Sequence, residues 1–428
     1  MLAGYLLLPS ATSVNVALLP PLDKSSIPAL TTFVLCWTKG TQVPPHRKSI
    51  LIYFCAAMFV LSPMFTSLTN SYELQTGARS LPGFYPLDAV KSSLNNLITL
   101  APFFIGMRFL SADGARASLL KSLPIAILFY SVPMLFEVRM SPQLHAWVYG
   151  FFPHDFGQQI RDGGFRPVVF LHHGIEVAFI TSLAVIAAAV AMRARWHVLR
   201  MPAGVATAYL AVVLLLCKTL GAAIYAFVFV PVVLFTKPKT WVRIACVIAL
   251  LICAYPLLRT YDIVPVHRIT TAANSISADR SSSFGWRVKN EDMLLEKANQ
   301  KPLLGWGTWS RNRVFDQESG RDISVTDGVW IIQFGVWGWM GYLSMFGLFA
   351  SSLFRARQAV RGPVSSSSIV TGGMSLLLAV NLVDLVPNAD LLPLTFLMAG
   401  TIAGCVARYP GKHVRKEMSS APAAWLAA

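Results

Sequence analysis

The sequence contains few charged residues, and acidic ones are especially scarce. Only 13% of its 428 residues are charged, whereas 55% are hydrophobic, and the mean hydropathy is +0.56. A typical soluble protein carries about 25% charged residues. This deficit excludes a soluble multidomain protein, and we predict an all-α integral membrane protein instead.

Other absences narrow the class further. The six cysteines all lie in or beside apolar segments, which is typical of small core residues and predicts neither a disulfide nor a zinc site. The sequence has no internal repeat, although many secondary transporters consist of paired repeats. Its N-terminus has no basic region before the first apolar stretch, so we expect a membrane helix there and not a removable signal.

The formal net charge of +16 raises the question of nucleic-acid binding. The basic residues are gathered between apolar segments, however, and such clusters mark the cytoplasmic side of a membrane protein. We therefore predict a lipid bilayer, and no nucleic acid, as a partner. The clusters are Lys39, Arg47 and Lys48; Arg108, Arg116 and Lys121; Arg193, Arg195 and Arg200; Lys237, Lys239 and Arg243; Arg355, Arg357 and Arg361; and Arg408, Lys412, Arg415 and Lys416.

Twelve apolar segments are candidates for crossings, since about 20 apolar residues span the core of a bilayer. Alternation through them puts both termini in the cytoplasm and every basic cluster on the same side. The first, second, seventh and eighth segments are short or joined by tight polar turns at 22–24 and 217–219, and a re-entrant pair at either place would keep this parity. The twelve segments are 2–19, 25–38, 49–68, 90–110, 119–136, 168–192, 202–217, 219–236, 242–257, 329–354, 366–385 and 391–408.

These segments divide the chain into three parts. An N-terminal transmembrane bundle at 1–257 includes an outer loop at 137–167, and a large polar loop follows at 258–328. The remaining part, 329–428, contains the last helices and a basic cytoplasmic tail. Because the large loop is far longer than a connection requires, we expect the chemistry of the protein there.

The large loop carries its own local signals. Residues 284–300 are good helix formers, the serines at 281–283 are suited to cap the first turn, and Pro302 ends the helix. Gly305 and Gly307 then permit backbone conformations that are closed to other residues. We therefore expect a short helix in this loop, followed by a tight glycine-containing segment.

Three ionisable residues in or beside this loop admit two interpretations each. Arg287 and Glu291 share one helix face, so they form either a weak surface ion pair or a site in which Arg287 binds phosphate through its planar charged fork. Asp327 precedes the segment 329–354, so it either caps that helix or serves as a general base at the membrane surface.

The outer loop 137–167 leads into a histidine pair. Gly163 and Gly164 predict a turn. Arg166 is either an anchor at the lipid headgroups or part of a site. In the expected crossing at 168–192, Glu176 lies roughly ten residues into the membrane, where an ionisable side chain is a functional candidate.

Two groups of motifs resemble a known family. The order of Arg287, Pro302-x-x-Gly305-x-Gly307, a polar residue at a helix start and Gly335-x-x-Gly338-x-x-Gly341 resembles the signature of the O-antigen ligase and O-antigen polymerase superfamily. A second group of motifs resembles the exopolysaccharide-polymerization branch of that superfamily. It consists of Gly163-Gly164-Phe165-Arg166-Pro167 with His172-His173-Gly174, and of Asp23-Lys24 after prolines. Ligases typically have a histidine where this chain has Thr326-Asp327, so that histidine is not carried over.

The resemblance implies a C-type glycosyltransferase in the bacterial inner membrane, with its active site at the periplasmic face. The implied donor is an oligosaccharide on undecaprenyl diphosphate, and no metal or other cofactor is expected. For a polymerase the acceptor is a growing lipid-linked glycan, and a chain-length regulator is a further candidate partner. For a ligase the acceptor is the lipopolysaccharide core. The outer motif favours the polymerase. A transporter or lipid-glycan flippase is the alternative from another class, and it predicts matched repeats.

The glycosyltransferase interpretation assigns roles to seven residues. Arg166 and Arg287 bind the diphosphate, because positioned cations stabilise a leaving anion. Asp327 is the first choice for the base that takes the acceptor proton. The further candidates are Arg161 and Lys289 for the diphosphate, and His173 and Glu291 for the base.

Overall fold

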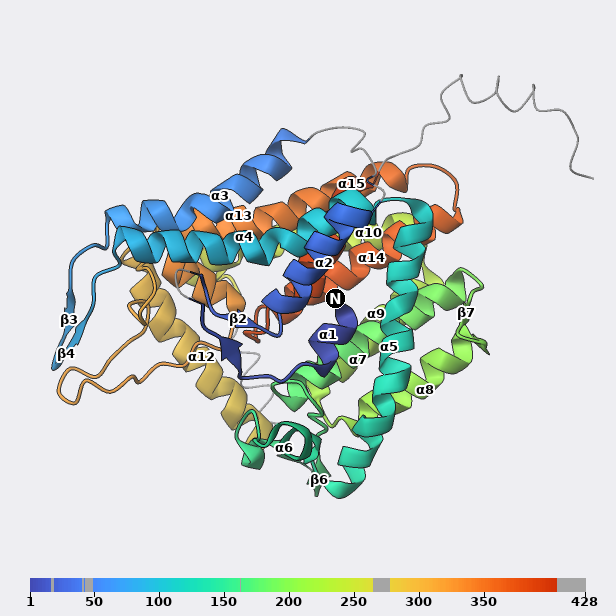
Figure 1. Ribbon diagram of the computed structural model, residues 1–428, viewed down its shortest axis with the longest axis horizontal. Helices are drawn as coiled ribbons and strands as arrows, with labels where there is room; N and C mark the ends of the chain where they lie inside the picture. The colour runs from blue at the N-terminus through green and yellow to red at the C-terminus, as the bar shows by residue number, and fades with distance from the viewer. Residues whose placement is uncertain (17–18, 41, 43–48, 162, 265–277, 406–428) are drawn as a thin grey trace, which may run out of the picture.

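The structure, a computed structural model, describes residues 1–16, 19–40, 42, 49–161, 163–264 and 278–405, with the backbone alone for 278–284. It is mostly helical, with short hairpins in the connections (Figure 1). The helices are α1 (Leu2–Leu7), α2 (Ser26–Lys39), α3 (Ile50–Leu68), α4 (Pro86–Phe109), α5 (Asp113–Met140), α6 (Leu144–Tyr149), η1 (Phe156–Gln159), α7 (Gly174–Arg193), α8 (Ala203–Leu216), α9 (Leu220–Phe235), α10 (Pro238–Thr260), α12 (Ala278–Asn299), α13 (Val329–Ala359), α14 (Ser366–Asp384) and α15 (Pro393–Gly404).

The strands form two-stranded antiparallel hairpins. Each joins neighbouring segments of the chain, so none of them builds a sheet across the molecule. The pairs are β1 (Ser13–Val14) with β2 (Leu22–Asp23), β3 (Leu74–Thr76) with β4 (Arg79–Leu81), β5 (Ile160–Arg161) with β6 (Gly164–Phe165), and β7 (His197–Val198) with β8 (Met201–Pro202).

Several helices are suited to a bilayer. Among the described residues, α3, α5, α7, α10 and α14 are long and apolar enough to cross a membrane, and α8, α9 and α15 are apolar but shorter. Large apolar side chains also point outward, such as Phe227 and Phe235 of α9, which are 81% and 84% exposed. Extensive exposed apolar surface is unfavourable in water. The chain is therefore a helical membrane protein.

The predicted count of twelve crossings is not confirmed. In place of one helix over 2–19, the structure has α1, which ends at Leu7, and then the β1–β2 hairpin. Proline and hydroxyl residues from Pro9 to Ser13 interrupt the apolar run and favour a turn. With 14 residues, α2 is about 21 Å long, which is short of the roughly 30 Å of a bilayer core. The basic tail lies outside the described residues.

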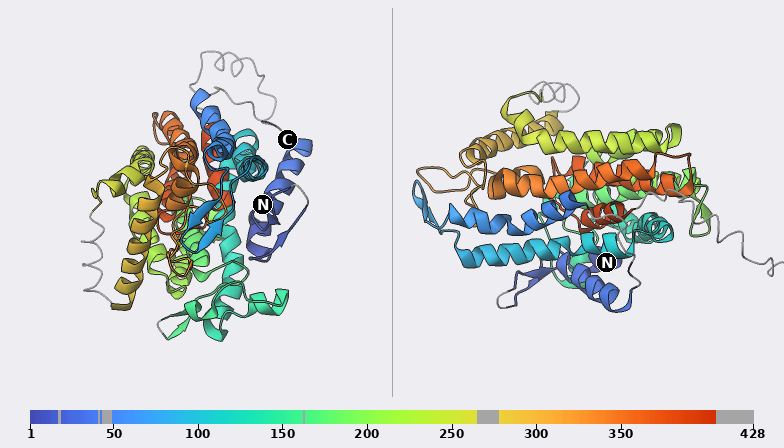
Figure 2. Two further views of the ribbon diagram at one scale, coloured as in Figure 1. Left: turned by 90° about the vertical axis from the view of Figure 1, so that its left-hand side faces the viewer. Right: turned by 90° about the horizontal axis from the view of Figure 1, so that it is seen from above.

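The interior of the bundle is built around α7. Almost every residue of α7 is buried, and it packs against α5, α8, α9 and α14. A second group, in which α13 packs on α3 and α10, and α4 on α3 and α15, lies beside it. Figure 2 shows the long helices of this group running side by side in the view from above. Aliphatic side chains join the two groups into one core.

Buried polar side chains tie the loops together at one end of the bundle. The carboxylate of Glu137 accepts hydrogen bonds from the backbone N–H groups of Val168 and Val169, both at 2.7 Å. The fully buried Arg311 donates to the carbonyl of Tyr72 at 2.9 Å. The segment before α7 is thus held against the end of α5, and the loop after α12 is held against the loop after α3.

The two glycine motifs bind each other through their backbones. Trp306 and Gly307 donate their N–H groups to the carbonyls of Gly335 and Val336 at 3.0 and 2.9 Å. At this point α13 is kinked, because Gly338 has a φ of +62° and a ψ of −165°. A Cβ on Gly305 would lie 2.4 Å from the carbonyl oxygen of Val336. The glycines thus allow two main chains to touch.

We expect Gly305→Ala to destabilise the protein strongly. Its φ of +70° disfavours alanine by roughly 1–2 kcal/mol, and the contact with Val336 adds to that cost. Thermal unfolding in detergent measures the effect. The matched control is Gly221→Ala, because nothing lies within 4 Å of that position. Equal unfolding temperatures for the two variants would contradict this view of the loop.

Candidate functional site

Helix α12 places two of the predicted site residues against the start of α13. It begins at Ala278, so the serines at 281–283 lie inside the helix and do not precede it. The amide N–H of Val325 donates to the side chain of Asn290 at 2.9 Å. The indole of Trp330, the second residue of α13, points its N–H at Glu291, 3.4 Å away. The expected loop helix is therefore present and docked.

Arg287 pairs with Asp327. Its Nε lies 3.4 Å from Oδ2 of Asp327, and both side chains are about one third exposed, at 33% and 29%. Nη1 of Arg287 also donates to the carbonyl of Pro387, in the turn after α14. The N-cap of α13 is Gly328, and no side chain caps it. The interpretation of Asp327 as a helix cap is therefore wrong.

Glu291 faces a different cation from the one its spacing suggested. Its Oε2 lies 3.6 Å from Nη2 of Arg259, at the end of α10, and Arg259 also binds Asp292 at 2.7 Å. A surface pair between Glu291 and Arg287 is thus wrong. Burial raises the pKa of Glu291 to about 7, although Arg259 opposes the shift. A carboxyl group with such a pKa can both give and take a proton near neutral pH.

Arg166 lies inside the protein. The β5–β6 hairpin turns at Gly163, which has a φ of +68°, and leads directly into it. The Arg166 guanidinium donates to the carbonyl of Lys218 between α8 and α9, with Nη2 at 3.2 Å and Nε at 3.4 Å. A Cβ on Gly174 would approach its Cβ to 2.8 Å, so the small residue after the histidine pair leaves room for it. Arg166 is only 9% exposed and is no headgroup anchor.

The charges of both predicted arginines act on His173. Burial, together with the charges of His154, Arg166, His172 and Arg287, lowers its pKa to about 3. Its Nδ1 accepts a hydrogen bond from the backbone N–H of Ile175 at 3.0 Å, so the ring proton resides on Nε2. The neutral imidazole therefore offers an N–H donor, and this arrangement suits it poorly as a base.

The structure does not place Arg161 and Lys289 with the other five candidate residues. Arg161 is exposed on β5, and its backbone carbonyl accepts a hydrogen bond from the ammonium of Lys218 at 3.1 Å. Lys289 is exposed on α12, two residues beyond Arg287, which is about 200° around the helix. Each of the two lies on a side of its element that faces solvent.

Sequence reasoning missed His154 and misplaced Glu176. The ring of His154 contacts those of His172 and His173, with centroids 5.1 and 4.8 Å apart. Its Nδ1 is buried without a hydrogen-bond partner among the described residues. The motif Phe152-Pro153-His154-Asp155 carried no spacing that predicted this. Because α7 begins at Gly174, Glu176 lies in its first turn and not ten residues deep.

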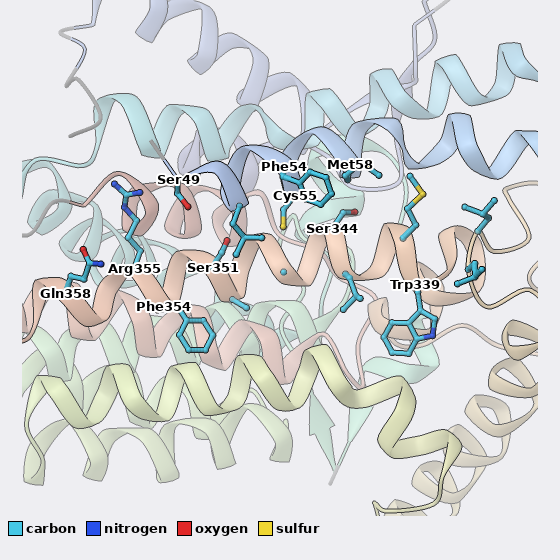
Figure 3. A pocket seen from close by; sticks show the side chains of 17 residues that line it. Ser49, Phe54, Cys55, Met58, Trp339, Ser344, Ser351, Phe354, Arg355 and Gln358 are labelled. Atoms are coloured by element: carbon cyan, nitrogen blue, oxygen red, sulfur yellow. The ribbon is translucent and has the colours of Figure 1, made fainter. Parts of the chain in front are cut away.

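An apolar groove runs along the outside of the bundle near this face. It has a volume of about 1080 Å³ and lies between α3 and α13, below the loop residues Leu303 and Leu304. In Figure 3, Phe54 and Cys55 of α3 and Phe354 of α13 are among the side chains that line it. The groove holds none of the seven candidate residues, so it offers an apolar surface and not the chemistry.

Neither comparison with known proteins nor the arrangement of possible metal ligands assigns a function to the chain. No protein-family model matches the chain, and a search of curated proteins gives no match. No group of three or more His, Cys, Asp or Glu side chains within the described ranges is placed to hold a metal ion. The candidate chemistry therefore rests on the side chains of Arg166, Arg287, His173, Glu291 and Asp327.

We expect Glu291 to make the folded protein less stable as the pH rises. Its pKa is about 7 when folded and near the ordinary 4.5 when unfolded, so the folded state binds the proton more tightly. Stability linked to this group is present below about pH 4.5 and is lost as the pH rises to 7. Glu291→Gln, compared with the exposed control Glu318→Gln, should gain unfolding temperature relative to wild type between pH 5 and 7. A difference that stays constant with pH would count against this assignment.

Proposed function

We propose that this protein is a membrane glycosyltransferase that joins oligosaccharide repeats carried on undecaprenyl diphosphate. It acts at the periplasmic face of the bacterial inner membrane, with the basic inter-helix clusters in the cytoplasm. The product is an exopolysaccharide or O-antigen chain. A ligase that transfers the glycan to the lipopolysaccharide core is the same chemistry with another acceptor.

The observation that carries this proposal is that two arginines from different loops both act electrostatically on one histidine. Arg166 comes from the outer loop and Arg287 from α12, yet both charges lower the pKa of His173. A diphosphate attached to a polyprenyl chain needs cations beside a lipid environment. Guanidinium groups bind phosphate oxygens in pairs. The described part of the chain also has five helices long and apolar enough to cross a membrane.

The proposed step is a single displacement at the anomeric carbon of the donor sugar. A hydroxyl oxygen of the acceptor bonds to that carbon while the bond from the carbon to the diphosphate oxygen breaks. The electron pair leaves with the diphosphate, and Arg166 and Arg287 stabilise the charge that develops on it. The hydroxyl proton passes to a carboxylate. Nε2–H of His173 is a further donor for the leaving oxygen.

Asp327 is the proposed base. Its carboxylate lies 3.4 Å from Arg287, so a proton acceptor stands directly beside the proposed diphosphate site. Glu291 is the rival, because its pKa of about 7 is well matched to proton transfer near neutral pH. It is directed toward Arg259 and Trp330, however, and not toward Arg287. His173 is disfavoured because its Nδ1 is already an acceptor.

The lipid part of the donor is proposed to stay in the bilayer beside the bundle. The groove between α3 and α13 offers one apolar surface for it, since its wall is formed mainly by aliphatic and aromatic side chains (Figure 3). The diphosphate then meets the protein where the apolar helices end and the polar loops begin.

Reconstituted wild-type protein with the lipid-linked repeat should produce a ladder of longer glycans on a gel, without added metal. A ladder from lipid-linked repeats alone identifies a polymerase, whereas product that requires lipopolysaccharide core identifies a ligase. Transport of the intact lipid-linked glycan without any new glycosidic bond would overturn the glycosyltransferase proposal and favour a flippase.

Arg166→Ala and Arg287→Ala should each slow transfer by about tenfold to more than a hundredfold, since a hydrogen bond to a charged group is worth roughly 1.5–3 kcal/mol. Lysine should rescue each position only in part, because it lacks the planar fork. The exposed Arg321→Ala is the matched control. Wild-type rates in both alanine variants, at normal abundance in the membrane, would remove the arginines from the mechanism.

Asp327→Asn should lower the transfer rate by about a hundredfold to ten-thousandfold, because asparagine keeps the shape of the side chain but cannot accept the proton. The single-turnover rate with saturating donor is the measurement. Asp262→Asn is the control, since Asp262 is exposed at the end of α10 and asparagine tolerates its φ of +51°. If Asp327→Asn is silent and Glu291→Gln is inactive, the base is Glu291.

A further inference from the structure

A polar cavity lies beside the histidine pair, with His172 in its wall. It has a volume of about 370 Å³, within the range of roughly 300–1,000 Å³ that small-molecule sites occupy. Its walls come from α1 and the segment after it, the β2–α2 turn, the start of α7 and the turn before α15. The ionisable side chains that line it are Tyr5, Asp23, Lys24, His172, Glu176 and Asp390.

Most of these groups already have partners. Glu176 accepts hydrogen bonds from the hydroxyl of Tyr5 and from the backbone N–H of His172, the latter at 2.9 Å. Asp23 accepts the backbone N–H groups of the turn that starts α2. Lys24 donates to the hydroxyl of Ser10 at 2.9 Å and lies 4.7 Å from the centre of the Tyr5 ring. These contacts hold the walls of the cavity in place.

Asp390 differs from the rest. No hydrogen bond or ion pair from any described residue reaches its carboxylate, and the half-buried side chain lines the cavity. Burial, together with the charges of Glu176 and Asp384, raises its pKa to about 7, and Lys24 opposes the shift. A carboxylate that lines a cavity and has no protein partner is available to accept a hydrogen bond from a ligand.

The charges of the cavity restrict the class of ligand. Three carboxyl groups and one ammonium line it, together with the hydroxyl side chains of residues 10, 12, 13 and 25. This excess of carboxyl groups disfavours the binding of phosphate. Phosphate is instead attracted by Arg166 and Arg287. The described residues also lack a metal-binding group. Carboxylates and hydroxyls in one pocket are suited to a neutral ligand with many O–H donors, which describes a sugar.

The cavity adjoins the proposed diphosphate site through consecutive residues. His172 lines the cavity. The next residue is His173, whose pKa is lowered by the charges of Arg166 and Arg287. The ring of His154 contacts both imidazoles. A ligand in the cavity and a diphosphate at the arginines would therefore be neighbours.

We infer that this cavity binds the sugar that accepts the transferred glycan, with the carboxylate of Asp390 accepting a hydrogen bond from one of its hydroxyls. The inference rests on the proposed glycosyltransferase function and divides that site in two. Arg166 and Arg287 bind the donor diphosphate, and the Asp390 cavity selects the acceptor.

The test uses the reconstituted full-length protein with lipid-linked donor and, as the probe, a water-soluble oligosaccharide of the same repeat. Asp390→Ala should raise the ratio of the acceptor KM to the donor KM by about tenfold or more, from the loss of a hydrogen bond to a carboxylate. Ser13→Trp, at an exposed position on the rim, should raise the same ratio by filling the cavity without a change of charge. The control is Asp262→Asn.

The outcomes separate the two proposals. If wild type forms glycosidic bonds and both cavity variants keep the control ratio, the acceptor site is overturned and the glycosyltransferase function stands. If wild type forms no bond, the function falls, and direct binding of the soluble oligosaccharide decides the cavity. Binding that is weakened in Asp390→Ala and Ser13→Trp upholds a sugar site, whereas equal binding to all variants overturns it.

Discussion

The main-chain contact between the two glycine motifs is the constraint on which the arrangement of α12 and α13 depends. Trp306 and Gly307 donate to carbonyls of α13, and the N–H groups of Trp339 and Met340 return hydrogen bonds to the carbonyls of residues 302 and 303. Side chains at Gly305 or Gly338 would separate the two backbones. The contact holds the segment after α12 on the kink of α13, and so it fixes where α12 presents Arg287 to Asp327.

Two groups of charged residues adjoin the consecutive histidines. The charges of Arg166 and Arg287 act on His173, whereas His172 lines the cavity together with Glu176 and Asp390. Electrostatic interactions are stronger away from bulk water, so each group favours a different class of ligand. The proposed transfer from a charged donor to a neutral acceptor would use two such groups, one for each substrate.

The sequence predicted most helices to within a few residues. The segments 49–68 and 366–385 correspond to α3 at Ile50–Leu68 and α14 at Ser366–Asp384. Long apolar runs between basic or proline-containing turns form helices wherever they pack, because every backbone group must be hydrogen-bonded inside a membrane. The same reasoning failed over 2–19, where mean apolarity hid a turn at Pro9, and it set the start of α7 too early for Glu176.

The class of the protein and the partners of its charged side chains were thus decided at different levels of structure. Membrane class, helix positions and the turn at Gly163 follow from composition and local pattern, which act over a few residues of chain. The partners of Arg287, Glu291 and Arg166 do not, since each contacts a group that is remote in sequence. Local spacing paired Arg287 with Glu291 and suggested no partner for Arg166. Arg287 meets Asp327, and Arg166 reaches the carbonyl of Lys218, only because helix packing brings the loops together. Which ionisable groups converge is a property of that packing and not of any motif.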